Sequence, residues 1–198
     1  MQSLSFIAST KYKKIMNFIA ILVAALVPTV LGFIWYHKSV FGKAWMAATG
    51  ITDEDAKSGN MPLMMGLSLL FSFLLAIMLQ NLCIHQLGVN SLLLNHLMEG
   101  SKESAESITA AKEIAAACGI VDAGSLGAKY TDGGAFGSAF RTFGHGMVHG
   151  FFAGLLIVLP IFATNGMFEK RPWKLTWINV GYWTLTLMLM CGILSAWQ

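Results

Sequence analysis

The chain has 198 residues, of which 56% are hydrophobic and only 12% are charged, and its formal net charge is +3. Soluble domains average about 25% charged residues, so this composition argues against a soluble globular protein and for an integral membrane protein. The Lys and Arg residues are dispersed along the chain, so the positive balance does not predict nucleic-acid binding.

Four stretches without Asp, Glu, Lys or Arg dominate the chain: residues 15–36, 61–98, 142–168 and 175–198. A helix needs roughly 20 apolar residues to cross the hydrocarbon core of a bilayer. In lipid the backbone must satisfy its own hydrogen bonds, and the alternating strands of a membrane β-barrel are missing. The sequence therefore predicts an all-α integral membrane protein. Its four transmembrane helices form two antiparallel hairpins in a single membrane domain, residues 1–198.

The first predicted span, residues 15–36, follows Lys11, Lys13 and Lys14 and has the outline of a signal peptide. Its apolar run is longer than the usual core of roughly 7–15 residues, and it ends in Trp35-Tyr36 rather than at a small-residue cleavage site. We therefore predict a retained span. Pro28 lies inside it and predicts a kink.

The second span is placed at about residues 63–83, where Ser68 and Ser72 form a stripe of small residues. The uncharged stretch continues to residue 98 as a partly interfacial segment. An extramembrane connection is expected over residues 84–141. It contains a short helix at about 101–118 that Gly119 ends.

The third span, residues 142–168, carries Gly146, Gly150 and Gly154 at intervals of four. Such a stripe lets another helix approach closely. Packing within the monomer is the first interpretation, and a contact between two copies is the alternative. Pro160 predicts a kink in this span.

His145 and His149 lie four residues apart on an adjacent strip of the same helix, so both rings can reach one metal ion or line one polar cavity. The Glu of a zinc-protease HExxH motif is missing. Three interpretations stay open: neutral imidazoles near the lipid headgroups, which we favour, a pore or ligand contact, and a metal or haem site. In the last case His85 is a candidate third histidine, and no cofactor is otherwise predicted.

The fourth span, residues 175–197, follows the third after a short connection, which predicts antiparallel neighbours. Tyr182 and Trp183 lie well inside it, where a phenol and an indole N–H need hydrogen-bonding partners. The candidate ligand or pore residues are therefore His145, His149, Asn165, Asn179, Tyr182 and Trp183. Cys83, Cys118 and Cys191 include no CxxC pair and are expected to be reduced thiols.

Several short motifs resemble domain-of-unknown-function family 1761 over about residues 17–197: NFIAILVAA at 17–25, GFIWY at 32–36, FGKAWM at 41–46, HGMVHG at 145–150, TN at 164–165 with FE at 168–169, and INVGYW at 178–183. The chain departs from the family where His37-Lys38 replaces the usual Ser-Pro, and its 84–141 connection is longer. The resemblance implies a small bacterial inner-membrane protein and implies no activity.

No GxSxG motif, Walker motif or membrane-embedded acid–base pair occurs. We therefore favour a non-enzymatic, multi-pass protein of the bacterial inner (cytoplasmic) membrane. Its partners would be lipid and either its own copies, in a homo-oligomer, or other membrane subunits, as an accessory subunit of a larger complex. One alternative is a small-solute transporter or channel with a polar path near His145 and His149. A second is a bis-histidine haem or metal-binding membrane protein.

Overall fold

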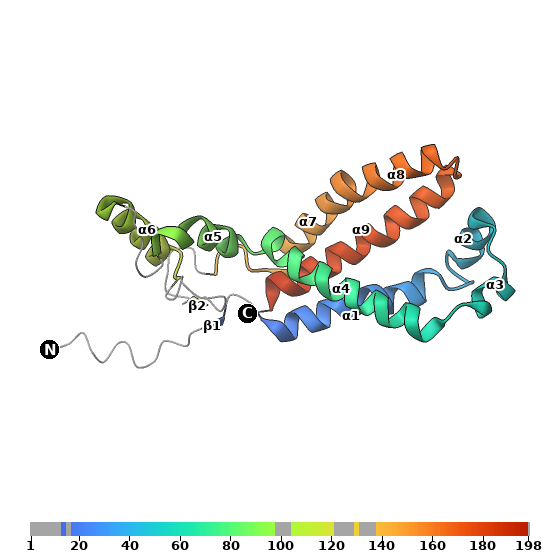
Figure 1. Ribbon diagram of the computed structural model, residues 1–198, viewed down its shortest axis with the longest axis horizontal. Coiled ribbons are helices and arrows are strands. Elements are labelled where there is room, and N and C mark those ends of the chain that lie inside the picture. The colour runs from blue at the N-terminus through green and yellow to red at the C-terminus, as the bar shows by residue number, and fades with distance from the viewer. Residues whose placement is uncertain (1–12, 15–16, 98–103, 121–128, 131–137, 198) are drawn as a thin grey trace. The chain divides into compact units, whose positions relative to one another are not determined.

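The computed structural model describes residues 13–14, 17–97, 104–120, 129–130 and 138–197 (Figure 1). Contacts divide the chain into two compact units. The apolar unit comprises Phe18–Cys83 and Thr142–Ala196, and the connector unit comprises Met1–Asn17, Ile84–Arg141 and Trp197–Gln198.

The apolar unit contains four helices that are long and apolar enough to cross a membrane. They are α1 (Phe18–Trp35), α4 (Met61–Cys83), a third helix over Phe143–Phe168 and α9 (Trp173–Ala196). The prediction of an all-α chain with four apolar spans is confirmed. The arrangement in two hairpins stays a prediction.

Helix α9 is the centre of the apolar unit. Within its most apolar window 56% of the residues are buried, against 17% for α4. It packs against α1, α4 and the third helix, and Figure 1 shows it between α7–α8 and the α1–α4 pair. Three of its residues, Met190, Cys191 and Leu194, are almost fully buried, as is Ile21 of α1. The most complete packing in the unit is therefore around α9.

The third apolar helix is continuous but contains a wide turn. It consists of α7 (Phe143–Ala153), the π-helix η2 (Gly154–Val158) and α8 (Leu159–Phe168). In the wide turn the Leu159 N–H donates to the carbonyl of Gly154, five residues earlier. Pro160 follows immediately, and a proline can neither donate to the carbonyl four residues earlier nor fit against it. The strain expected at Pro160 is thus accommodated by one π-turn.

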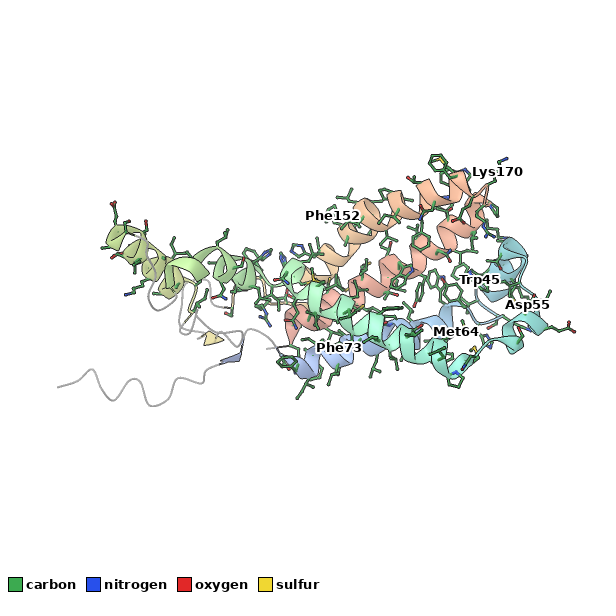
Figure 2. All side chains as sticks on the ribbon, in the orientation of Figure 1. Trp45, Asp55, Met64, Phe73, Phe152 and Lys170 are labelled. Carbon is green, nitrogen blue, oxygen red and sulfur yellow. The ribbon has the colours of Figure 1, made fainter. Side chains whose placement is uncertain are left out.

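Two short helices, α2 (Gly42–Thr49) and α3 (Asp53–Ser58), connect α1 to α4. Helix α3 begins with a capping box: the Thr52 hydroxyl accepts a hydrogen bond from the Asp55 N–H, and the Asp55 carboxylate accepts one from the Thr52 N–H. The Thr52 hydroxyl also donates to the Asp55 carboxylate at 2.6 Å, and this bond, together with that from the Thr52 N–H, lowers the pKa of the Asp55 carboxyl. Figure 2 shows Asp55 and Lys170 at the same end of the unit, while Phe152 projects from an apolar helix.

The connector unit contains α5 (His85–Leu97), α6 (Ala105–Ala117) and a pair of two-residue strands, β1 (Lys13–Lys14) and β2 (Lys129–Tyr130). The strands are antiparallel, and α5 packs on α6. Helix α6 ends before Gly119, whose φ of 72° is the left-handed conformation that glycine adopts most easily after a helix. Cys118, the C-cap of this helix, is buried, and burial raises the pKa of its thiol.

Candidate functional site

The two histidines of the apolar unit face one another on α7. Thr142 caps the helix by accepting a hydrogen bond from the His145 N–H. One turn later the Nε2 atom of His149 lies 3.0 Å from the Nε2 atom of His145, and the ring centroids are 4.7 Å apart. In the neutral pair one Nε2 carries the hydrogen and the other accepts it. Both rings are half-buried, and two facing imidazole nitrogens can act as ligands of one metal ion.

The glycines beside these histidines bring α7 against the backbone of α9. A Cβ atom on Gly146 would lie 2.8 Å from the Ser195 Cβ, and one on Gly150 would lie 2.5 Å from the Met188 Cα. At Gly154 an added Cβ would lie 2.7 Å from the Thr184 Cβ. These distances leave no room for a side chain. The three glycines therefore form a close intramolecular contact with α9, which we call the glycine face.

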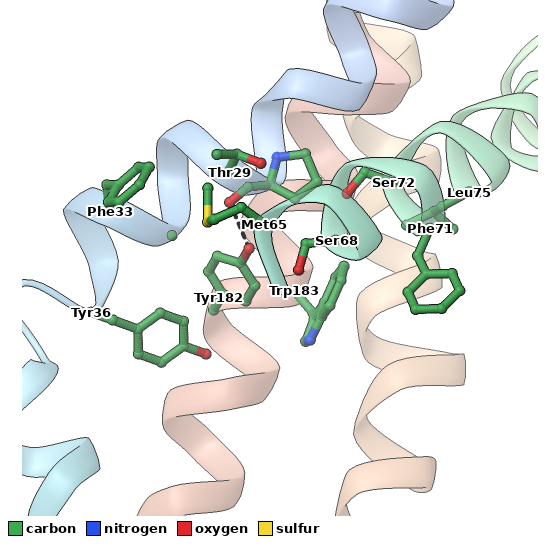
Figure 3. A pocket seen from close by; sticks show the side chains of 12 residues that line it. Thr29, Phe33, Tyr36, Met65, Ser68, Phe71, Ser72, Leu75, Tyr182 and Trp183 are labelled. Atoms are coloured by element: carbon green, nitrogen blue, oxygen red, sulfur yellow. Dashed lines mark hydrogen bonds between the residues drawn. The ribbon is translucent and has the colours of Figure 1, made fainter. Parts of the chain in front are cut away.

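A cavity of about 520 Å³ lies between α1, α4 and α9 (Figure 3). Two of its lining residues, Tyr182 and Trp183, are among the ligand or pore residues predicted from the sequence, and two more, Ser68 and Ser72, were predicted as a helix-packing stripe. Sequence reasoning missed the α1 wall, which consists of Pro28, Thr29, Gly32, Phe33 and the following Tyr36. We call this cavity the aromatic pocket.

Hydrogen bonds fix the tyrosines of the aromatic pocket. The Tyr182 hydroxyl donates to the Pro28 carbonyl at 2.7 Å, and this bond is buried. The Tyr36 hydroxyl donates to Asn179 Oδ1 at 3.1 Å. The two tyrosine rings lie 5.1 Å apart between centroids. Nearby, the Trp35 indole N–H donates to the Ile178 carbonyl at 3.1 Å, which ties the end of α1 to α9.

A second cavity, of about 420 Å³, is lined by α2, α8 and α9 and is more polar. Asn165 and Asn179 line it, together with Glu169 and Arg171. The latter two form an ion pair of 3.3 Å between Nε and Oε2, and both side chains are largely exposed. This cavity suits water or a small polar solute.

The predicted site residues of the apolar unit therefore lie in three places: the histidine pair, the polar cavity and the aromatic pocket. Asn165 follows His149 by 16 residues on one helix, which is roughly 24 Å at the helical rise. A solute path that joins them would have to follow much of the third helix, and it stays a prediction. His85 belongs to the connector unit, where its ring meets Phe140 edge-on at 5.6 Å.

Four long apolar helices, charged residues at the connections and a pocket within the helices define a multi-pass α-helical membrane protein. The model of the family described as protein of unknown function, DUF1761, matches residues 19–195. The chain belongs to this family, as its motifs predicted. No curated protein and no solved structure matches it.

Proposed function

We propose that the protein is a non-enzymatic, multi-pass protein of the bacterial inner membrane that works as a homo-oligomer, with α4 as the contact helix. One observation carries this proposal. The first half of α4, residues 61–71, is almost entirely exposed in the single chain, whereas more than half of the apolar window of α9 is buried.

The exposed surface of α4 has a regular face. Viewed along the helix, the side that lines the aromatic pocket carries Met65, Ser68 and Ser72. The opposite side carries residues at alternating intervals of four and three, as in helices that pack side by side: Leu63, Leu67, Leu70 and Leu74, all exposed. We call this second side the leucine face.

Gly66 adds to the argument because it lies between Leu63 and Leu70 and nothing occupies the space where its side chain would be. Helices in lipid associate by close packing, since lipid tails are as apolar as leucine, and a small residue lets two backbones approach. The leucine face and Gly66 together support a contact between α4 of one copy and α4 of a second.

The test is the mass of the full chain in lipid nanodiscs, combined with cysteine crosslinking. Leu70→Cys on the leucine face should form disulfide-linked dimers under mild oxidation. Leu22→Cys on α1 is the matched control, because Leu22 is exposed to a similar degree, 56% against 51% for Leu70. The native cysteines Cys83, Cys118 and Cys191 are buried and leave little background.

Dimers with Leu70→Cys and none with Leu22→Cys would support the proposal. A strictly monomeric mass with no crosslink at either position would refute it. A stoichiometric complex with a different membrane subunit would favour the role of an accessory subunit instead.

A second candidate function, metal binding, is favoured by the histidine pair. Zinc binds imidazole nitrogens at about 2.0–2.1 Å in a tetrahedral arrangement, which places two such nitrogens roughly 3.3 Å apart. The observed separation of 3.0 Å between the two Nε2 atoms is close to this value. Metal analysis and calorimetric titration with Zn²⁺ test the idea, and a visible spectrum without a Soret band excludes haem.

In that titration His149→Ala should abolish binding. His37→Ala is the control, because His37 lies in the turn after α1 and its ring contacts Ser39. Equal zinc binding by His149→Ala and the unsubstituted protein would exclude the pair as the site.

A further inference from the structure

The aromatic pocket contains hydrogen-bond donors that have no partner. The side chains of Thr29, Ser68, Ser72 and Trp183 line the pocket, and none of them forms a hydrogen bond with the residues that the structure describes. Ser72 is only 5% exposed. Trp183 lies well inside α9. Within a bilayer, water does not compensate such groups, and each unsatisfied one costs free energy.

The two tyrosine hydroxyls of the pocket, in contrast, already donate their hydrogens to other groups. Tyr182 donates its hydrogen to the Pro28 carbonyl, and Tyr36 donates its hydrogen to Asn179. An indole N–H can only donate, and a hydroxyl without a partner can donate its hydrogen. The available donors are therefore the three aliphatic hydroxyls and the Trp183 N–H, and a ligand with acceptor oxygens would satisfy all four of them.

The walls of the pocket define the rest of the ligand. None of the 12 lining residues is charged, and five of them are aromatic: Phe33, Tyr36, Phe71, Tyr182 and Trp183. A volume of about 520 Å³ is within the range of small-molecule sites. A neutral, flat ring fits such walls, because aromatic side chains favour offset-stacked and edge-to-face contacts with another ring.

Figure 3 shows how the donors are distributed around the pocket. Ser68 of α4 lies next to Trp183 of α9, and Ser72 lies one helical turn further along α4. Phe33 and Phe71 mark the open rim, since they are 64% and 62% exposed. A ligand can therefore place its ring among the donors and leave an apolar tail in the lipid.

We infer that the aromatic pocket binds a membrane-soluble ring that carries carbonyl acceptors, which is the chemistry of a quinone. The carbonyl oxygens accept hydrogen bonds from Trp183 and from the serine hydroxyls of α4, and the tail leaves past Phe33 or Phe71. The inference is independent of the proposed homo-oligomer, because the pocket and the leucine face occupy opposite sides of α4.

The experiment titrates the full chain in mild detergent with decylubiquinone and follows binding by native mass spectrometry and by the shift in melting temperature. Decylbenzene, which has a ring and the same tail but no carbonyl group, is the matched ligand control. We expect one saturable decylubiquinone adduct that raises the melting temperature, and no comparable effect of decylbenzene.

Two variants locate the site. Trp183→Phe keeps an aromatic ring but removes the N–H, and Ser68→Ala removes a hydroxyl at an exposed position where folding is little affected. Together they should weaken decylubiquinone binding at least tenfold. Trp177→Phe, at an exposed residue of α9 outside the pocket, should leave it unchanged.

Three results would overturn the inference. They are the lack of a saturable decylubiquinone adduct, equal binding of decylbenzene and decylubiquinone, and Trp183→Phe and Ser68→Ala variants that bind decylubiquinone as tightly as the unsubstituted protein. Equal binding of decylbenzene would show that the cavity merely accepts apolar chains. A strictly monomeric mass without a crosslink at Leu70 or Leu22 would refute the proposed homo-oligomer and would leave the binding of decylubiquinone unaffected.

Discussion

The two sides of α9 are built in different ways. On the α7 side, glycines replace side chains and the two backbones approach each other at Gly146 and Gly150. On the α1–α4 side, aromatic side chains line a cavity of about 520 Å³. The α7 side of α9 is therefore rigid, because its backbone contacts leave no space, whereas the α1–α4 side has room for a ligand.

The physical reason is that helix association in lipid depends on packing rather than on the hydrophobic effect. A close backbone contact gains dispersion along its length and cannot adjust without moving a helix. A cavity loses those contacts, and hydrogen bonds such as that from Tyr182 to Pro28 must hold its walls in place.

The largest effect is expected at Gly150 on the glycine face. The nearest atoms to an added Cβ belong to the backbone of Leu187 and Met188, so Gly150→Ala forces the helices apart. Overpacking of this kind costs about 3 kcal/mol, at the upper end of its usual range. Unfolding in mixed micelles of increasing SDS content measures it.

Gly144→Ala, in the first turn of the same helix α7, is the control for this experiment. Nothing lies within 4 Å of a Cβ added there, and alanine is the better helix former by roughly 0.5–1 kcal/mol. We expect equal or slightly greater stability. Equal losses of stability at Gly144 and Gly150 would show that the close contact with α9 does not explain the loss at Gly150.

A smaller loss is expected at Gly154, where the close atoms belong to the side chain of Thr184. Gly154→Ala should cost about 2 kcal/mol. Thr184→Ala removes the hydroxyl and the methyl group, two of the three close atoms, so the double variant should recover part of the loss. No side-chain truncation can rescue Gly150→Ala in this way. If the stability losses of the two single variants simply added in the double variant, the side chain of Thr184 would not be what clashes with the added Cβ.

The glycine face also shows what sequence reasoning can and cannot reach. An interval of four residues places Gly146, Gly150 and Gly154 on one side of a helix, because the α-helix has about 3.6 residues per turn. The interval does not identify the helix they meet. Only the structure places them against Cys191, Leu187 and Thr184 of α9.

The four spans were predictable because charged residues are costly in lipid and are therefore missing from long stretches. The aromatic pocket was not, since Thr29, Ser72 and Trp183 come from three helices that are distant in sequence. The available signal was indirect: polar side chains inside three apolar spans. Pro160 predicted a local distortion, but not that a π-turn would accommodate it.

On the α1–α4 side of α9, Tyr182→Phe tests whether hydrogen bonds between helices stabilise the walls of the aromatic pocket. The substitution removes the 2.7 Å bond to the Pro28 carbonyl without changing the volume of the ring. Hydrogen bonds between membrane helices contribute about 0.6 kcal/mol on average and at most about 1.7 kcal/mol. We therefore expect a loss of about 1 kcal/mol in the same SDS titration, smaller than at Gly150.

Tyr36→Phe is the comparison, because its 3.1 Å bond to Asn179 is only partly buried. It should cost less than Tyr182→Phe. If Tyr182→Phe lost more stability than Gly150→Ala, the α1–α4 side of α9 and not the α7 side would be the more rigid one.

The smallest effect concerns Asp55, which belongs to neither side of α9. Its pKa is lowered in the folded protein by hydrogen bonds to Thr52, so it stabilises α3 above the ordinary carboxyl pKa. That contribution is lost as the pH falls through the lowered pKa. Hydrogen exchange, corrected for its intrinsic pH dependence, should show α3 losing protection in acid while residues 143–168 keep theirs. Asp55→Asn should remove the pH dependence, and Glu54→Gln should not. If α7 and α9 lost protection in acid to the same extent as α3, the contact between the glycine face and α9 would not be the rigid part of this protein.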